Sequence, residues 1–195
     1  MRDLGLPFWL AGGRGTAEAV HEARMLGATG IQVGTLFAYC NESGLAPDVR
    51  TEVLHGIVDG NVRVRTDPRA SPTGYPFKVV AMDGVVHQDE SRERVCDLGY
   101  LRTAYRSRTG RLGYRCPAEP VADYVKKGGD IADTVGRRCL CNGLTATIGL
   151  AQQRRAGEEA PLVTSGDDLT SVAELARASG HYSAADVIGY LLGHG

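Results

Sequence analysis

The sequence lacks a surplus of either charge, because its 195 residues carry 22 lysines and arginines against 23 aspartates and glutamates. A nearly neutral chain has no electrostatic reason to bind nucleic acid or an anionic membrane. The sequence also has no apolar run near the roughly 18 residues that a membrane helix needs, and no signal-peptide core at its start. We therefore expect a cytoplasmic protein with neither nucleic acid nor a membrane as partner.

Paired Cys-x-x-Cys motifs are absent as well. The five cysteines are Cys40, Cys96, Cys116, Cys139 and Cys141. An odd number at irregular spacing favours reduced thiols over a disulfide framework. The last four could gather around zinc, but one Cys-x-Cys with two single cysteines lacks the knuckles of ordinary zinc ribbons. The favoured reading is buried small side chains with no metal, and a metal assay would decide between the two.

The chain has enough apolar residues, 43%, for one core, so we expect one domain or one domain with a small satellite. Residues 7–11 have the pattern of a strand buried on both faces. Thr16 can cap the helix that follows, and Gly27 can end it. A second short strand is expected at 30–33, which completes a right-handed parallel βαβ unit.

The remaining elements are less regular. A helical segment is expected after Thr35, interrupted by residues 41–44 and Pro47 before a helix at 49–58. A strand is expected at 61–66, and strands at 77–82 and 85–87 are expected to flank a hairpin turn at Asp83-Gly84, which together make a small antiparallel element. Residues 88–116, with their arginine cluster, are predicted to be mostly a solvated or ion-paired loop. Further helices are expected at 120–127, 140–153, 168–178 and 183–192, the last with Ser183 and Asp186 at its start.

Two glycine turns hold the most specific signal. Gly12-Gly13 and Gly34-Thr35 each follow an expected strand and precede an expected helix. In a (β/α)8 barrel, the loops after the last two strands form a phosphate site, where glycines let backbone N–H groups approach oxygen. Short turns need glycine for backbone reasons alone, so the spacing by itself is weak support for a phosphate.

Resemblance to a known family strengthens this reading. Residues 10–17 (Leu-Ala-Gly-Gly-Arg-Gly-Thr-Ala) and 26–35 (Leu-Gly-Ala-Thr-Gly-Ile-Gln-Val-Gly-Thr), with Phe37, resemble the closing βαβ unit of the FMN-dependent barrels that include nitronate monooxygenases and flavin-type enoyl-ACP reductases. Residues 66–78, 96–100, 113–120 and 138–142 are similar to the tail of the bacterial nitronate monooxygenase-like branch. Together these segments extend over nearly the whole chain.

The resemblance implies FMN as cofactor and a small nitronate as substrate. By similarity, Gly12, Gly13, Gly34 and Thr35 would hold the FMN phosphate, chiefly through backbone amides. Gln32 might reach the flavin, although an interior glutamine with its hydrogen bonds satisfied is the favoured alternative. No catalytic residue is assigned, because none of the five histidines (His21, His55, His87, His181 and His194) lies in a matching motif.

The expected fold is α/β: residues 1–58 form the last two βα units of a TIM barrel, and residues 59–195 form a subdomain with a small hairpin and helices. Two strands cannot close an eight-stranded barrel. We therefore expect a fragment or a misplaced start codon, or a missing barrel half supplied in cis or by another chain. The expected activity is oxidation of alkyl nitronates with oxygen by the completed barrel, with the isolated chain inactive. A flavin-dependent enoyl-thioester reductase and a non-catalytic interaction module remain alternatives.

Overall fold

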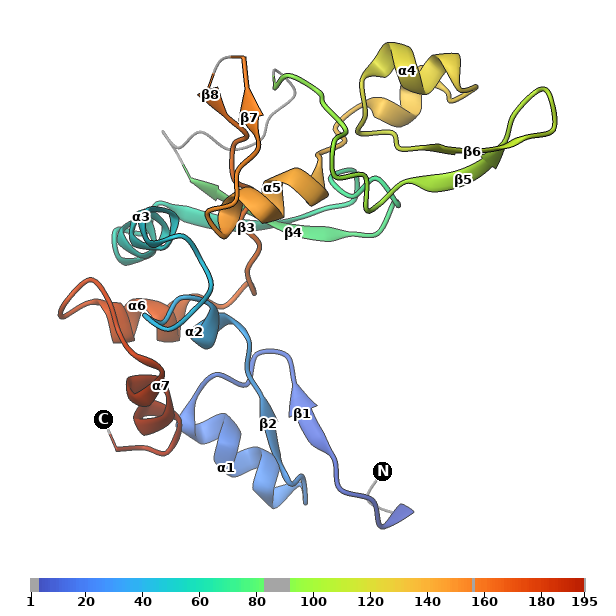
Figure 1. The fold of residues 1–195 in the computed structure, drawn as a ribbon. Helices are drawn as coiled ribbons and strands as arrows, with labels where there is room; N and C mark the ends of the chain where they lie inside the picture. The colour runs from blue at the N-terminus through green and yellow to red at the C-terminus, as the bar shows by residue number, and fades with distance from the viewer. Residues whose placement is uncertain (1–3, 83–91, 156, 195) are drawn as a thin grey trace. The chain divides into compact units, whose positions relative to one another are not determined.

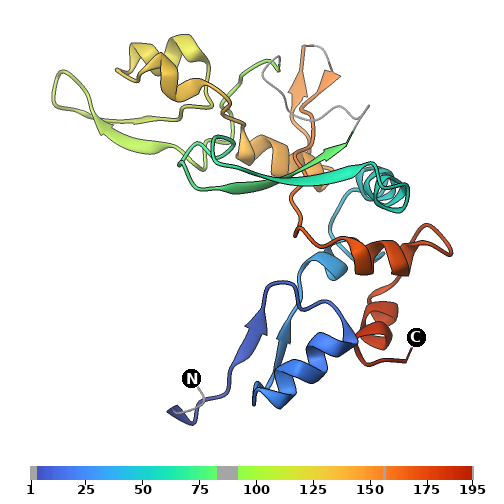
Figure 2. The ribbon, with the colours of Figure 1, turned by 180° about the vertical axis from the view of Figure 1, so that it is seen from behind.

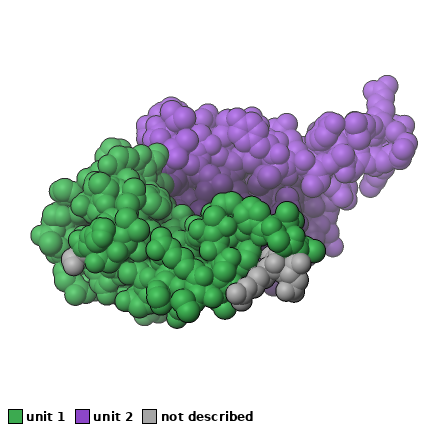
Figure 3. Space-filling view, turned by 90° about the horizontal axis from the view of Figure 1, so that it is seen from below, with its two compact units in different colours: residues 1–64, 165–195 green, residues 65–164 purple. Residues whose placement is uncertain are grey.

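A computed structural model describes residues 4–82, 92–155 and 157–194. The chain divides into two compact units, which Figure 3 colours separately. Unit 1 comprises residues 1–64 and 165–195, and unit 2 comprises residues 65–164. Each unit contains helices and short strands, so the α/β class is confirmed. In the described ranges the strands form four separate two-stranded sheets, and none of these closes into a barrel.

Unit 1 contains the N-terminal elements together with the last two helices (Figures 1 and 2). In chain order these are β1 (Trp9–Ala11), α1 (Ala17–Met25), β2 (Gly30–Gln32), α2 (Thr35–Ala38), α3 (Pro47–Val58), α6 (Thr170–Ala176) and α7 (Ala184–Leu191). β3 (Val62–Asp67) then leads the chain into unit 2.

The predicted βαβ unit is confirmed. β1 pairs with β2 in parallel, with Leu10 opposite Ile31, and Figures 1 and 2 both show α1 beside this sheet. The Thr16 hydroxyl accepts a hydrogen bond from the Ala19 N–H at 3.2 Å, as expected of an N-cap. Gly27, at φ +80°, follows the helix in the left-handed conformation that glycine tolerates best.

The two strands are not buried on both faces, which corrects the expectation from their apolar composition. Trp9 is 58% exposed and Leu10 is half-buried, while Ala11 is exposed. The sheet has only two strands and one helix beside it, so most of the surface of both strands is left uncovered. Apolar composition identified the strands, but what covers them depends on the number of neighbouring strands.

We expect the isolated chain to self-associate in solution through this sheet. Each strand has one side without a partner strand in the described structure, and Trp9 exposes apolar surface beside it. Sedimentation velocity should detect species larger than the monomer, and Trp9→Lys should reduce them by placing a charge on the edge. A stable monomer with one cooperative melting transition would contradict this expectation.

The last 31 residues belong to unit 1, whereas the sequence reading assigned them to the C-terminal subdomain. The Tyr182 hydroxyl donates to the Leu36 carbonyl at 2.8 Å, and the Asn41 N–H donates to the Tyr182 carbonyl at 2.8 Å. α7 begins with the expected capping box, in which Ser183 and Asp186 exchange hydrogen bonds. The predicted domain boundary after residue 58 therefore does not coincide with the boundaries of the compact units. Hydrogen bonds between distant segments join the two ends of the chain in one unit.

Unit 2 consists of β4 (Phe77–Met82), β5 (Thr103–Arg106), β6 (Leu112–Arg115), α4 (Val121–Lys126), the 3-10 helix η2 (Ile131–Thr134), α5 (Leu140–Thr147), β7 (Gln153–Arg154) and β8 (Gly157–Glu158). β4 pairs with β3, and both ribbon views show α5 alongside this pair. The expected turn at Asp83-Gly84 and the strand after it lie outside the described residues.

The helical segment expected after Thr35 is interrupted before the next helix, as predicted, because α2 ends at Ala38 and α3 begins at Pro47. Pro47 occupies the first position of α3, two residues before the expected start, where its missing N–H costs nothing. One helix prediction needs correction. α5 ends at Thr147 and not at residue 153, because Gly149 adopts a positive φ of +81° and the chain turns there. No helix of the described residues is both long and apolar enough to cross a membrane.

The prediction of mostly loop for residues 88–116 was wrong where β5 and β6 form an antiparallel hairpin. The Ser107 N–H donates to the Arg111 carbonyl at 2.8 Å and closes the turn, in which Gly110 has a φ of +80°. Both faces of the hairpin are largely exposed, so its strands carry no hydrophobic alternation. The Arg115 guanidinium lies 5.0 Å from the centroid of the Tyr105 ring, a cation–π contact on one face.

Candidate phosphate site

The two glycine turns leave the β1–β2 sheet at the same edge. Because the strands are parallel and Ala11 lies opposite Gln32, the residues that follow both strands emerge side by side. Gly12-Gly13 continues from one strand, and Gly34-Thr35 lies just beyond the other. The pairing therefore brings the four residues predicted to hold the FMN phosphate to one edge, with Gln32, predicted to reach the flavin, at the end of β2.

The three glycines of these turns leave free space beside their backbone. Gly12 and Gly13 have φ values of +82° and +61°, whereas Gly34 has a φ of −109°. A β-carbon built onto any of the three would meet no atom within 4 Å, and all three residues are exposed. Backbone N–H groups at such positions can be approached closely by an anion.

Thr35 takes part in a contact that the sequence did not indicate. The Gly166 N–H donates to the Thr35 hydroxyl oxygen at 3.1 Å, across 131 residues of sequence. A β-carbon on Gly166 would lie 2.5 Å from that oxygen, so only glycine fits there without a shift. Since the hydroxyl accepts from Gly166, its own hydrogen remains available to donate to a phosphate oxygen.

Arg14 directly follows Gly13 and places a cation beside that loop. Its guanidinium donates to Glu22 at 2.9 Å, and its side chain is 29% exposed. Helix α2 has only four residues, and the Thr16 hydroxyl already occupies one donor at the start of α1. The helix termini therefore offer fewer free N–H donors than the sequence reading supposed, which leaves the loop amides as the main donors that an anion could meet.

The other predicted residues lie as follows. Gln32 is exposed at the end of β2, so the interior role considered for it is not what the structure has. His21 is exposed on α1, and the ring nitrogen Nδ1 of His181 lies 3.3 Å from the Asn41 amide nitrogen. His87 lies outside the described residues. Among the described residues, no histidine forms a hydrogen bond or ion pair with the glycine loops.

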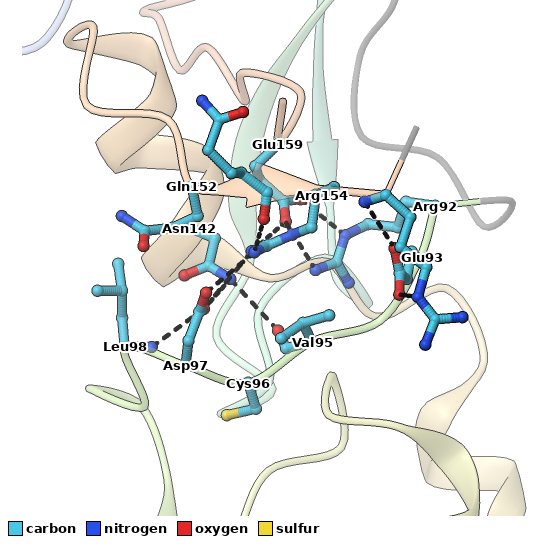
Figure 4. A network of polar contacts seen from close by, with 12 residues as sticks. Arg92, Glu93, Val95, Cys96, Asp97, Leu98, Asn142, Gln152, Arg154 and Glu159 are labelled. Atoms are coloured by element: carbon cyan, nitrogen blue, oxygen red, sulfur yellow. Dashed lines mark hydrogen bonds and ion pairs between the residues drawn. The ribbon is translucent and has the colours of Figure 1, made fainter. Parts of the chain in front are cut away.

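Unit 2 contains a buried ion network that sequence reasoning missed (Figure 4). Glu159 is joined to Arg92 at 2.9 Å and to Arg154 at 2.7 Å, and all three side chains are less than 10% exposed. Arg154 also reaches Asp97 at 3.0 Å, and the Asn142 amide donates to the same carboxylate at 2.7 Å. Arg92 and Glu159 are 67 residues apart, so no local pattern could have indicated the pair.

Two members of the network, Asp97 and Arg154, have shifted pKa values. Burial opposes the charge on Asp97, but hydrogen bonds from Arg154 and Asn142 keep the pKa of that carboxyl below its usual value. Burial likewise opposes the charge on Arg154, and its bonds to Asp97 and Glu159 nevertheless raise its pKa. With two cations and two anions joined, the network is neutral, as a structural cross-link requires.

Comparison with known proteins adds no relative to this description. No protein-family model, no curated protein and no solved structure matches the chain.

Proposed function

We propose that the chain is the C-terminal part of an FMN-dependent (β/α)8-barrel oxidoreductase of the nitronate monooxygenase type. The observation that carries this proposal is the parallel register of β1 and β2, which places both glycine turns at one sheet edge. That edge is where the loops after the last two strands of such a barrel bind phosphate. The motifs in residues 10–17 and 26–35, quoted above, support the same assignment.

In this proposal the chain's own residues bind and orient the cofactor. The amides around Gly12, Gly13 and Gly34 face the phosphate, and the Thr35 hydroxyl, held by Gly166, donates to it. Gln32 is exposed at the same edge, where a bound ligand could reach its side chain. Bound FMN would supply the redox chemistry with oxygen. The flavin-ring pocket and any base would come from six further βα units, in cis or on another chain.

The isolated chain is expected to have no nitronate oxidase activity. It supplies two strands of a barrel that needs eight, and no described histidine lies at the loops to act as a base. Oxygen uptake with 2-nitropropane anion or propionate 3-nitronate should remain at the background rate for the purified chain. The same assay on the chain joined to six βα units should show turnover.

The outcomes separate the competing functions. Turnover by the purified chain alone would contradict the proposal that further βα units supply the flavin-ring pocket and the base. If the completed barrel binds FMN but consumes nicotinamide with an enoyl thioester and not oxygen with a nitronate, the protein is a flavin reductase. If the completed barrel binds no FMN, a non-catalytic interaction module is the correct reading.

A further inference from the structure

A groove in unit 2 lies between the β5–β6 hairpin and α4, which both ribbon views show side by side. Its volume is about 910 Å³, which suits a ligand of nucleotide size better than a single small ion. Among the described residues that line the groove, none is acidic and five are basic: Arg106, Arg108, Arg115, Lys126 and Lys127. The groove therefore gathers positive charge in a chain that is nearly neutral overall.

Arg115 joins the two walls of the groove. Its guanidinium lies 5.0 Å from the centroid of the Tyr105 ring on the hairpin and 5.3 Å from that of the Tyr124 ring on α4. It also donates to the Lys127 carbonyl at 3.1 Å. A β-carbon on Gly113, which pairs with Tyr105 across the hairpin, would lie 2.6 Å from that ring, so glycine leaves the ring its space. These contacts fix the position of the Arg115 cation before any ligand binds.

Most of the positive charge in the groove is not balanced by a carboxylate. The side chains of Arg108 and Lys126 are exposed and form no hydrogen bond or ion pair with the described part of the chain. Arg106 donates to a backbone carbonyl of the hairpin turn at 3.3 Å. Lys127, by contrast, is paired with Glu119 at 2.6 Å. Of the five cations, one is therefore neutralised by a carboxylate and four are left for a ligand.

We propose that this groove binds a small ligand through a chain of two or more phosphate groups, as in a nucleoside triphosphate or an inorganic polyphosphate. Guanidinium groups bind phosphate oxygens two at a time and stay charged at every physiological pH. One phosphate monoester has a charge of about −1.5 to −2 at pH 7, so it would leave about half of the four charges unbalanced. A chain of two or three phosphates matches them.

The basic residues of the groove all lie within residues 106–127. Their charge is gathered in one groove and does not form the extended track that a nucleic-acid strand follows, which favours a small ligand. Three of the five side chains are exposed, so salt should weaken the binding of a phosphate chain. All five belong to unit 2, whereas the glycine turns proposed for FMN belong to unit 1, so the two sites can be tested separately.

The test is calorimetric titration of the full 195-residue chain with inorganic tripolyphosphate, pyrophosphate and phosphate at one ionic strength, and affinity should fall in that order. Arg108→Gln combined with Lys126→Gln should lower the affinity for tripolyphosphate by about tenfold or more, because both lost contacts are with a charged ligand. Arg111→Gln combined with Arg155→Gln is the matched control. It removes the same charge from exposed arginines of unit 2 that do not line the groove, and should change the affinity by less than about twofold.

Adenosine triphosphate in place of tripolyphosphate identifies the source of the phosphates: tighter binding indicates a nucleotide, and any other result indicates a polyphosphate. Absence of tripolyphosphate binding overturns the proposal, as does an equal affinity for phosphate. A groove variant that binds tripolyphosphate as tightly as its control also overturns it, because the ligand would then respond to overall charge or lie elsewhere. Tighter binding of a single-stranded oligonucleotide than of tripolyphosphate would make the groove a nucleic-acid surface instead.

Discussion

Gly34→Val should lower the affinity of the proposed flavin barrel, once completed, for FMN by about a hundredfold or more. At φ −109° the backbone of Gly34 accepts any side chain, and a β-carbon there would meet no atom within 4 Å. Valine would therefore fit the protein but occupy the space of the phosphate. Losing at least two charge-assisted hydrogen bonds, each worth about 1.5–3 kcal/mol, accounts for a fall of that size.

A substitution at Gly12 would be harder to interpret, because its φ of +82° strains any other residue. Such a variant would lose fold stability as well as FMN affinity. Thr35 provides graded controls. Thr35→Ser keeps the hydroxyl that accepts from the Gly166 N–H, and should leave FMN affinity nearly unchanged. Thr35→Ala removes one side-chain donor and should cost less than Gly34→Val.

Riboflavin, which lacks the phosphate, distinguishes ligand contact from fold. Its affinity, measured by flavin fluorescence titration, should be nearly the same for Gly34→Val as for the unaltered barrel. Equal losses for FMN and riboflavin would mean that Gly34 serves the fold and that the phosphate assignment is wrong.

Glu159→Gln should destabilise unit 2 by about 3–5 kcal/mol, the usual cost of removing one partner from a buried ion pair. The substitution keeps the size of the side chain but leaves Arg92 and Arg154 facing a neutral amide at contacts of 2.9 and 2.7 Å. Asp97 compensates Arg154 only in part, because its own side chain is 33% exposed.

Hydrogen exchange followed by mass spectrometry suits this measurement, because it reports α5 and the segment around β7 separately from unit 1. Glu93→Gln is the matched control. Its partner Arg155 is 93% exposed and lies 3.8 Å away, so we expect a change within about 0.5 kcal/mol. A loss below about 1 kcal/mol for Glu159→Gln would show that the network is not the cross-link we describe.

The sequence alone determined those elements whose signals lie within a few residues of one another. The Thr16 cap and Gly27 bound α1, and the bonds between Ser183 and Asp186 begin α7, because each interaction joins atoms within one helical turn. The parallel βαβ unit followed from the order of its elements and from the handedness of such crossovers. The glycine turns were found for the same reason, since the backbone conformation of a tight turn depends on residues adjacent in sequence.

Only the tertiary structure decided which distant segments meet. The bond from Gly166 to Thr35 spans 131 residues, and the contacts of Tyr182 with α2 place the chain's end in unit 1. The β5–β6 hairpin escaped prediction because strands exposed on both faces carry no apolar period. Local propensity depends on neighbours in sequence, whereas pairing across a fold depends on the complementary shape and charge of surfaces that exist only once the chain has folded.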